Sequence, residues 1–320
     1  MRDIWYWPAC LAGGARPRSL SVGNDHGAGN GGHARGQHGV GSRNGYLPGA
    51  ASLSGIQKFA CWTLAAIVLG GIALSIIVPA DYTVQFRETP NAVPTHQHLL
   101  GTDELGRDRL ARVLYGTRIS LLLAPAAAFL STLMAALIGV VSGYFGSWCE
   151  RLALAVTDLV LSLPWLFLML AVRAVLPLNV SPLTSVVITF LLLGLLGWAA
   201  SARVLCTGTR VLRNSDFILQ ARASGLHGFR LLAVHIIPNL KPVLYAQFLI
   251  SVPVFILSEA NLGILGLGVA EPLPSWGSLL RELEGWGGFS TEPWKLAPML
   301  LLILVVSCFQ VILAREEVSA

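Results

Sequence analysis

Residues 216–239, DFILQARASGLHGFRLLAVHIIPN, decide how this chain is interpreted. The stretch is basic, it is punctuated by glycine and proline, and apolar runs long enough to cross a bilayer lie on both sides of it. A chain that crosses a membrane exposes its polar connecting segments to water, where soluble partners can bind them. The stretch therefore predicts a folded polar segment between two membrane spans.

The composition of the 320 residues indicates an integral membrane protein. Hydrophobic residues make up 54% of the chain and charged residues 12%, and the mean hydropathy is +0.66, whereas an ordinary soluble domain has about 25% charged residues. Because about 20 apolar residues cross the hydrocarbon core, long apolar runs predict spans. An all-α, polytopic fold with about six transmembrane helices is predicted, with spans at 59–79, 119–149, 152–176, 174–202, 242–258 and 296–314.

Two features of these runs bear on how the spans pack and on the energetic cost of placing charge in a membrane. The run 152–176 carries Asp158 and Arg173, and the others have no charged residue. Gly139 and Gly143 have the GxxxG spacing that permits two helices to approach closely.

The chain is expected to divide into four parts. Residues 1–55 are rich in glycine and show no apolar periodicity, so a disordered cytoplasmic tail is expected there. Residues 56–118 hold the first transmembrane helix and an extracytoplasmic segment, residues 119–315 form the core with a cytoplasmic loop at 203–241, and residues 316–320 form a short tail. The segments expected inside carry 14 of the 22 Lys and Arg residues, which places both termini in the cytoplasm.

No sequence motif of a catalytic or metal site is found. GxSxG, HExxH and GxxxxGK[ST] are absent, so any ATP must bind to another subunit. The five cysteines have no CxxC spacing and are interpreted as small buried hydrophobes and free thiols. His26, His33 and His38, and also His96 and His98, are interpreted as polar surface residues and not as metal ligands. No bound cofactor is expected.

The segment 216–239 resembles the cytoplasmic EAA loop of ABC-importer permeases. The usual pattern is Glu-Ala-Ala, three residues, Gly, and an apolar-rich segment that ends in Pro. Leu219 and Gln220 stand where the pattern has Glu and the first Ala, whereas Ala221, Gly225 and Pro238 keep their places. The resemblance implies an ATPase-coupling loop that includes Leu219, Gln220, Ala221, Arg222, Ala223, Gly225 and Pro238.

The residues of this loop also support that interpretation by their own chemistry. Ala221 and Ala223 are small enough for close approach, and Gly225 can adopt a left-handed conformation. A short helix, a break and a second helix are therefore predicted. The alternative is a basic cytoplasmic loop that fixes the topology and contacts anionic lipid.

Two further segments resemble dipeptide, oligopeptide and nickel permeases. HLLGTDELGRDRLARVLYGTRISLLL, residues 98–123, resembles the HPLGTDxxGRDxxSRxxYGxRxSL segment that precedes their second span. SEANLGILGLGVAEPLPSWGSLL, residues 258–280, resembles the TEAxLSFLGLGxxPPxPSWGxML segment after their fifth span. The resemblance is to the second, C-type, permease subunit of a peptide importer.

These two segments contain the candidate extracytoplasmic residues. A structural clamp at the membrane face is favoured over direct substrate binding, because Gly101 and Gly106 suit turns and Asp103, Arg107 and Asp108 suit ion pairs or caps. The turn AEPLPSWG, with its tryptophan, is expected to form an outer gate, a docking surface for a binding protein, or an aromatic anchor at the membrane interface. The full set is Gly101, Thr102, Asp103, Gly106, Arg107, Asp108, Pro274, Ser275, Trp276 and Gly277.

Asp158 and Glu259 are acidic residues in or near predicted spans. Intramembrane carboxylates are costly and often functional, so a proton or cation path is one alternative. Asp158 follows Arg151 by seven residues, and an ion pair or helix-end contact near the cytoplasmic face is preferred for it. Glu259 matches a family position in the outer part of the fifth span, where a structural polar contact or pore lining is preferred.

The resemblance implies a chain that forms half of a translocation pore in the cell (inner or plasma) membrane. The partners that it implies are a sibling permease, cytoplasmic ATP-binding subunits that carry ATP and magnesium, and an extracytoplasmic peptide-binding protein, with no nucleic acid. Dipeptides and oligopeptides are the expected cargo, and nickel or another small solute is the alternative. An ATP-independent secondary transporter is a rival interpretation, and a membrane enzyme ranks last.

Overall fold

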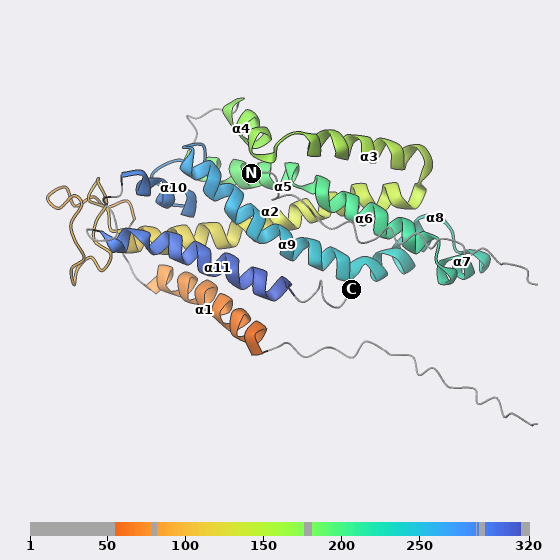
Figure 1. Ribbon diagram of the computed structural model, residues 1–320, viewed down its shortest axis with the longest axis horizontal. Coiled ribbons are helices and arrows are strands. Elements are labelled where there is room, and N and C mark those ends of the chain that lie inside the picture. The colour runs from red at the N-terminus through yellow and green to blue at the C-terminus, as the bar shows by residue number, and fades with distance from the viewer. Residues whose placement is uncertain (1–54, 78–81, 176–180, 286, 288–291, 315–320) are drawn as a thin grey trace, which may run out of the picture. The chain divides into compact units, whose positions relative to one another are not determined.

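The computed structural model describes residues 55–77, 82–175, 181–285, 287 and 292–314 (Figure 1). The tail predicted for residues 1–55 lies outside these ranges except for its last residue. The regular secondary structure of the described residues is helical, and their only β pairing is an isolated bridge between Thr102 and Asp108. The helices are α1 (Gly55–Ile77), α2 (Arg109–Phe145), α3 (Ser147–Ser162), α4 (Trp165–Val175), α5 (Pro182–Leu196), α6 (Trp198–Arg213), α7 (Asp216–Ala223), α8 (Gly228–Leu231), α9 (Ile237–Ile264), α10 (Trp276–Arg281) and α11 (Ala297–Leu313).

Four stretches of the described chain are long and apolar enough to cross a membrane. They are Arg109–Phe145, Pro182–Arg213, Gly228–Ile264 and Pro293–Leu313. Helices α3 and α4 pass the same test only as a pair, and the pair is bent by 85°. The apolar part of α1, Gly55–Gly71, is shorter than these. The all-helical class is confirmed for the described residues, but length and composition support four spans, or five with the bent pair, and not all of the predicted six.

The break between α3 and α4 follows from one proline. Leu163 precedes Pro164 and has φ −83° and ψ 131°, which is extended backbone. A residue before proline is pushed out of the helical region by its contact with the proline ring. The run 152–176, predicted as one span, therefore forms two helices.

Close packing of α2 on α6 depends on the predicted GxxxG pair. A Cβ atom at Gly139 would lie 2.4 Å from the carbonyl oxygen of Ala202, and one at Gly143 would lie 2.6 Å from that of Cys206. The two backbones are thus nearly in contact, as the spacing predicts. Helix α2 also packs against α5 and α9, whereas α1 lies against α2 and α11.

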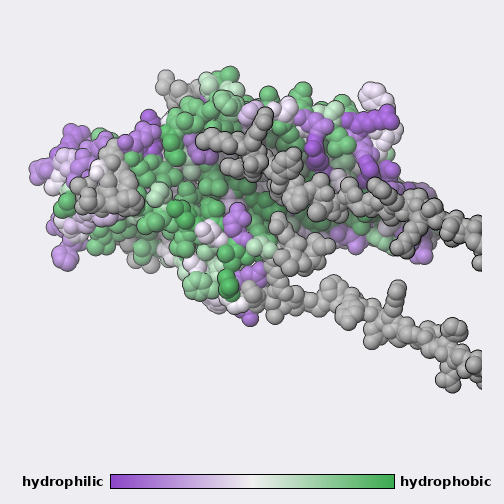
Figure 2. All heavy atoms as spheres, in the orientation of Figure 1, coloured by the Kyte–Doolittle hydropathy of each residue, from purple (hydrophilic) through white to green (hydrophobic). Residues whose placement is uncertain are grey.

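The surface agrees with a membrane environment. In Figure 2, hydrophobic residues cover the middle of the visible face, and hydrophilic residues gather toward the two ends of the helices. The outward side chains of the long helices include exposed apolar residues such as Phe129 and Leu137 of α2. Such a band is what hydrocarbon covers in a bilayer.

Candidate functional site

Six charged side chains form an ion-pair cluster where the segment before α2 meets the segment after α9. Arg112, from α2, is fully buried and pairs with Asp103. Its Nη2 lies 3.1 Å from Glu271, and its Nη1 lies 2.7 Å from Glu282. A buried guanidinium needs such partners, because burying an unpaired charge is costly. The ion-pair cluster consists of Asp103, Arg107, Arg109, Arg112, Glu271 and Glu282.

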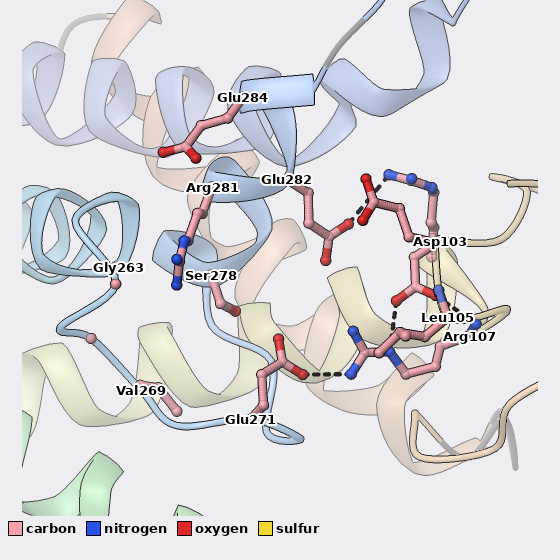
Figure 3. A pocket seen from close by; sticks show the side chains of 14 residues that line it. Asp103, Leu105, Arg107, Gly263, Val269, Glu271, Ser278, Arg281, Glu282 and Glu284 are labelled. Atoms are coloured by element: carbon pink, nitrogen blue, oxygen red, sulfur yellow. Dashed lines mark hydrogen bonds and ion pairs between the residues drawn. The ribbon is translucent and has the colours of Figure 1, made fainter. Parts of the chain in front are cut away.

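Two further arginines complete the ion-pair cluster. Arg107 binds Asp103 through Nε at 2.6 Å and pairs with Glu271 through Nη1 (Figure 3). Arg109 donates from Nε to the carbonyl oxygen of Thr102 at 2.9 Å and lies 3.4 Å from Glu282. The cluster thus joins residues about 160 positions apart in the sequence. It holds the segment 98–123 against the segment that follows α9.

The acidic groups of the cluster differ in their protonation. Burial by itself would raise the pKa of Asp103, but hydrogen bonds from Arg107 and the charge of Arg112 outweigh burial and hold that pKa below its ordinary value. Burial raises the pKa of Glu282, and the charges of Arg112 and Arg109 offset this only in part. Asp103 is therefore the fixed anion of the cluster, and Glu282 is the carboxyl that takes up a proton more easily.

The loop before α2 requires its two glycines. Gly101 and Gly106 have φ of +68° and +76°, where a side chain is disfavoured. A Cβ atom at Gly101 would lie 2.2 Å from the carbonyl oxygen of Ala92, and one at Gly106 would lie 2.3 Å from that of Phe86. Thr102, also buried, accepts a hydrogen bond from the backbone N–H of Ala92 at 2.9 Å. The predicted turns are present at both glycines.

Asp108 caps helix α2. Its Oδ1 accepts a hydrogen bond from the backbone N–H of Ala111 at 3.1 Å, and its Oδ2 lies 2.8 Å from Nδ1 of His98. A carboxylate at a helix N-terminus satisfies a free N–H group and interacts well with the helix dipole. His98 thereby has a structural partner inside the same loop.

The turn that contains Trp276 is buried, which corrects the prediction of an aromatic anchor at the interface. Trp276 has no exposed surface, and its Nε1 donates to Oγ1 of Thr117 at 3.0 Å. Ser275 caps α10 in a reciprocal pair with Ser278. The tryptophan ring binds α10 to α2 because its apolar body is buried and its N–H group has a partner. Pro274 is buried in the same turn.

Helices α9 and α10 meet at glycines. A Cβ atom at Gly263 would lie 2.3 Å from the Cα of Gly277, so neither position has space for a side chain. Glu259, one turn earlier in α9, is fully buried, and its carboxylate lies beside Ser120, Ser275 and the backbone of Gly277. Its main-chain oxygen would lie 2.8 Å from a Cβ atom at Gly277. Glu259 therefore lies at the contact between these two helices.

A cavity of about 460 Å³ lies beside the ion-pair cluster. Figure 3 shows Arg107, Glu271 and Glu282 on one side of it, and the end of α9 with Arg281 of α10 on the other. Five carboxylates and three guanidinium groups line it. Its volume is in the range of small-molecule sites, but such sites are usually more apolar.

Arg173 stands in the sequence as a positive charge within an apolar run. It is buried in α4, and its Nε donates to the carbonyl oxygen of Leu267 at 3.0 Å. Its Nη2 donates to Oγ of Ser185 at 2.8 Å. Arg173 thus ties α4 to α5 and to the segment after α9. A lone arginine in a predicted span was the signal, because such a charge needs internal partners.

Asp158 lies on the exposed side of α3. It forms an ion pair, one of the two contacts preferred from the sequence, and its partner is Arg203 of α6 and not the nearby Arg151. The reason is geometric, since α6 packs along α3 and brings Arg203 to the side chain of Asp158. Asp158 and Glu259 belong to different helices and have different surroundings, because Asp158 is exposed and paired with an arginine, whereas Glu259 is fully buried and no ion pair holds it within the described residues.

The α7–α8 segment, residues 216–239, has the predicted order of helix, break and helix. The N–H of Leu226 donates to the carbonyl oxygen of Ala221 at 3.1 Å, and Gly225 has φ +88°. This bonding closes a helix with a left-handed residue. After the break, α8 continues through a π-helical turn, Leu232–Ile236, directly into α9.

One side of the α7–α8 segment is anchored. Ile218, Leu231 and Ile236 have no exposed surface, and they pack with Tyr144 of α2 and Leu205 of α6. The guanidinium of Arg222 lies 6.0 Å from the centre of the Tyr144 ring. The segment is thus a folded part of the helical body.

The other side of the same segment is apolar and exposed. Phe229 is 74% exposed, and Phe217 and Leu219 are also exposed. Apolar side chains at a polar end of a membrane protein indicate a surface for another protein. Neither phenylalanine belongs to the motif pattern in the sequence, and the signal for them is the presence of aromatic residues within a basic stretch. Of the residues implied by the resemblance, Ala221 and Arg222 are half-buried, and Leu219, Gln220, Ala223, Gly225 and Pro238 are exposed.

Comparison with known proteins gives one family and a consistent set of relatives. The family model described as "Binding-protein-dependent transport system inner membrane component" matches residues 135–315. An oligopeptide transport system permease protein OppC from Mycobacterium tuberculosis is 34% identical over 260 residues, which cover 79% of this chain and 86% of the relative. Proteins with the same description from Haemophilus influenzae and Bacillus subtilis are 32% and 31% identical over 77% and 72% of this chain, and over 79% and 73% of their own lengths.

Proposed function

This chain belongs to the family of binding-protein-dependent transport system inner membrane components, and on that premise we propose that it is one permease subunit of an ATP-driven oligopeptide importer. The names of the relatives support peptides as cargo. The observation that carries the proposal is the α7–α8 segment, which is anchored by buried side chains on one side and exposes apolar side chains on the other. Such a surface fits a groove on an ATP-binding subunit.

The proposed assembly distributes its tasks among several chains. This subunit forms half of the pore and a sibling permease forms the other half, while ATP and magnesium bind to cytoplasmic subunits, and a peptide-binding protein delivers cargo from outside. The chain has six spans if α1 and the bent pair α3–α4 each count as one. Both termini and the loop 203–241 then lie in the cytoplasm, and the ion-pair cluster lies at the outer face as a structural clamp.

The coupling is mechanical and involves no covalent step in this chain. Closure of the ATP-binding subunits would move α8, and α8 passes into α9 through the π turn without a loop. Short π-helical turns inside helices frequently mark functional positions. The far end of α9 touches α10 at Gly263 and Gly277. Displacement at the cytoplasmic loop can therefore reach the outer end of α9, and this movement would let the pore between the two permease subunits open alternately to the two sides.

Co-purification with the ATP-binding subunit tests the proposal. The permease pair is co-expressed with its ATP-binding subunits, and recovery of the ATPase is compared for wild type, Phe229→Asp and Gly225→Asp. Loss of the ATPase is expected in both variants. The matched control is Trp148→Asp, because Trp148 at the start of α3 is 76% exposed and thus as accessible as Phe229.

Three outcomes contradict the proposal at different levels. Equal recovery in all variants would show that the α7–α8 segment is not the ATPase contact. Peptide uptake that continues without any ATPase would favour a secondary transporter. If nickel or another small solute competes for uptake and peptides do not, the proposed cargo is wrong, while the proposed assembly stands.

A further inference from the structure

Two apolar troughs lie on either side of Tyr245 in α9. The larger, about 470 Å³, is formed by α1, α9 and α11, with Cys61 and Phe309 among its walls. The smaller, about 330 Å³, is formed by α2 and α9, with Leu133 and Phe248 among its walls. Tyr245 lines both troughs and is 59% exposed. Its side chain is therefore a ridge shared by the two apolar troughs.

The end of these troughs nearest the α7–α8 segment is cationic. Lys241 lies four residues before Tyr245 in α9, on the same face and one turn nearer to the start of the helix. Lys58 lies three residues before Cys61 in α1, also one turn nearer to the start of its helix. Both lysines are exposed, and neither has an ion pair within the described part of the chain.

No acidic residue near these lysines neutralises them along their own helices. Helix α1 contains no Asp or Glu, and the first acidic residue of α9 is Glu259. The chain has only three lysines, and the third, Lys295, is buried and lies 2.6 Å from Glu292 at the opposite end of α11. The two lysines without an ion pair in the described chain, Lys58 and Lys241, therefore both lie at this end of the troughs.

We propose that the two troughs hold the two acyl chains of one anionic phospholipid, with Tyr245 between the chains and the phosphate near Lys241 and Lys58. Paired troughs on one ridge match a lipid with two chains, whereas one crevice would match any single chain. Basic residues at the cytoplasmic ends of membrane helices attract anionic headgroups, and pockets of this kind between helices bind them specifically. The site goes beyond the proposed transport function and does not depend on the cargo.

The site lies on the helix that the α7–α8 segment enters. Lys241 follows the π turn by five residues, so the headgroup would contact the start of α9. A lipid bound there would favour the position of α9 in which both troughs are open. Lipid composition would then affect transport without any change in the cargo site.

Lipid retention by the purified permease pair with its ATP-binding subunits tests the proposal. The complex is incubated in detergent with phosphatidylglycerol or with phosphatidylcholine of the same chains, and bound lipid is counted by native mass spectrometry. Preferential retention of phosphatidylglycerol is expected, with a loss of about tenfold in Lys58→Gln/Lys241→Gln. The control is Arg151→Gln, because Arg151 is an exposed cation at the start of α3 without an ion pair in the described chain. An equal loss in the control, or no preference between the lipids, would overturn the site.

A second pair of variants tests the troughs and not the charge. Ala65→Phe and Ala136→Phe place bulk in the larger and the smaller trough, and each is expected to lower retention of phosphatidylglycerol while the lysines remain. A photoreactive residue in place of Tyr245 identifies the occupant in the assembled complex. Labelling of lipid supports the proposal, and labelling of the sibling permease or of no lipid overturns it.

Discussion

The ion-pair cluster and the α7–α8 segment differ in whether their side chains find partners within the chain. In the ion-pair cluster the charged groups find their partners inside the chain, and Arg112 is fully buried among them. In the α7–α8 segment the buried anchor is complete, but Phe229 and Phe217 remain exposed. The charged groups of the first region are paired within the chain, whereas the second region exposes apolar side chains. Burial of charge thus marks a clamp, and exposure of apolar surface marks a contact for a partner.

The largest expected effect on stability comes from a substitution that disrupts the ion-pair cluster. Asp103→Ala removes the central anion and leaves Arg112 buried with fewer partners, which should lower the free energy of unfolding by about 3–5 kcal/mol. Thermal unfolding in detergent measures the loss. Asp158→Ala is the control, because its pair with Arg203 is exposed and should contribute at most about 1 kcal/mol. Equal losses would mean that burial does not distinguish the two pairs.

Acidification should act on the clamp through the same residue. Since the pKa of Asp103 is held below its ordinary value, its contribution to stability is present above that ordinary value and is lost as the pH falls through the lowered pKa. Unfolding of wild type should therefore become easier below about pH 4, and Asp103→Asn should show less of this dependence. An unchanged pH profile in the variant would remove Asp103 as the cause.

The buried side of the α7–α8 segment should resemble a core. Ile218→Ala leaves a cavity against α2 and α6, and a loss of about 2–4 kcal/mol is expected because Ile218 has no exposed surface. Urea or thermal unfolding measures it. A negligible effect would show that the segment is held by its helices' own propensity and not by packing.

A smaller effect is expected within the clamp at Glu282. Burial raises the pKa of this carboxyl, so its stabilising contribution is present at acid pH and is lost as the pH rises through the raised pKa. Glu282→Gln mimics the protonated form, and at pH 7 it should change the free energy of unfolding by at most about 1 kcal/mol, less than Asp103→Ala. A loss as large as that of Asp103→Ala would show that the charge of Glu282 is required.

The smallest effect on stability is expected at the exposed side of the α7–α8 segment. Phe229→Ala should change the free energy of unfolding by about 0.5 kcal/mol or less, because the side chain touches little of its own chain. The same variant should lose much of its affinity for the ATP-binding subunit in a pull-down. A large loss of stability with unchanged binding would reverse the roles of the two sides.

Local rules predicted the turns of this protein well. Gly101, Gly106 and Gly225 all have positive φ, and that preference belongs to glycine itself. The GxxxG pair likewise predicted that a second helix approaches α2 closely, and the structure shows that this helix is α6. Pro164 also indicates the break between α3 and α4, but the run of apolar residues around it led to the prediction of one continuous span.

Contacts between distant residues were not predictable in this way. The apolar body and single donor of Trp276 suit a membrane interface as well as a buried contact with Thr117, and only the packing of α10 on α2 decides between them. Closeness in sequence suggests Arg151 as a partner of Asp158, whereas α6 supplies Arg203. Arg112 and Glu282 meet across 170 residues, a pairing that no spacing rule contains.

The sequence by itself determined that this chain is helical, apolar and polytopic, and it determined where its turns lie and which family it resembles. These properties follow from residue-level preferences, because hydrophobicity, glycine conformations and proline restrictions act within a few residues. The tertiary structure alone decided which charges are buried together, which aromatic residue is enclosed and which apolar residues stay exposed. Those outcomes depend on helices that meet in space, and the free energy of burial is a property of both partners.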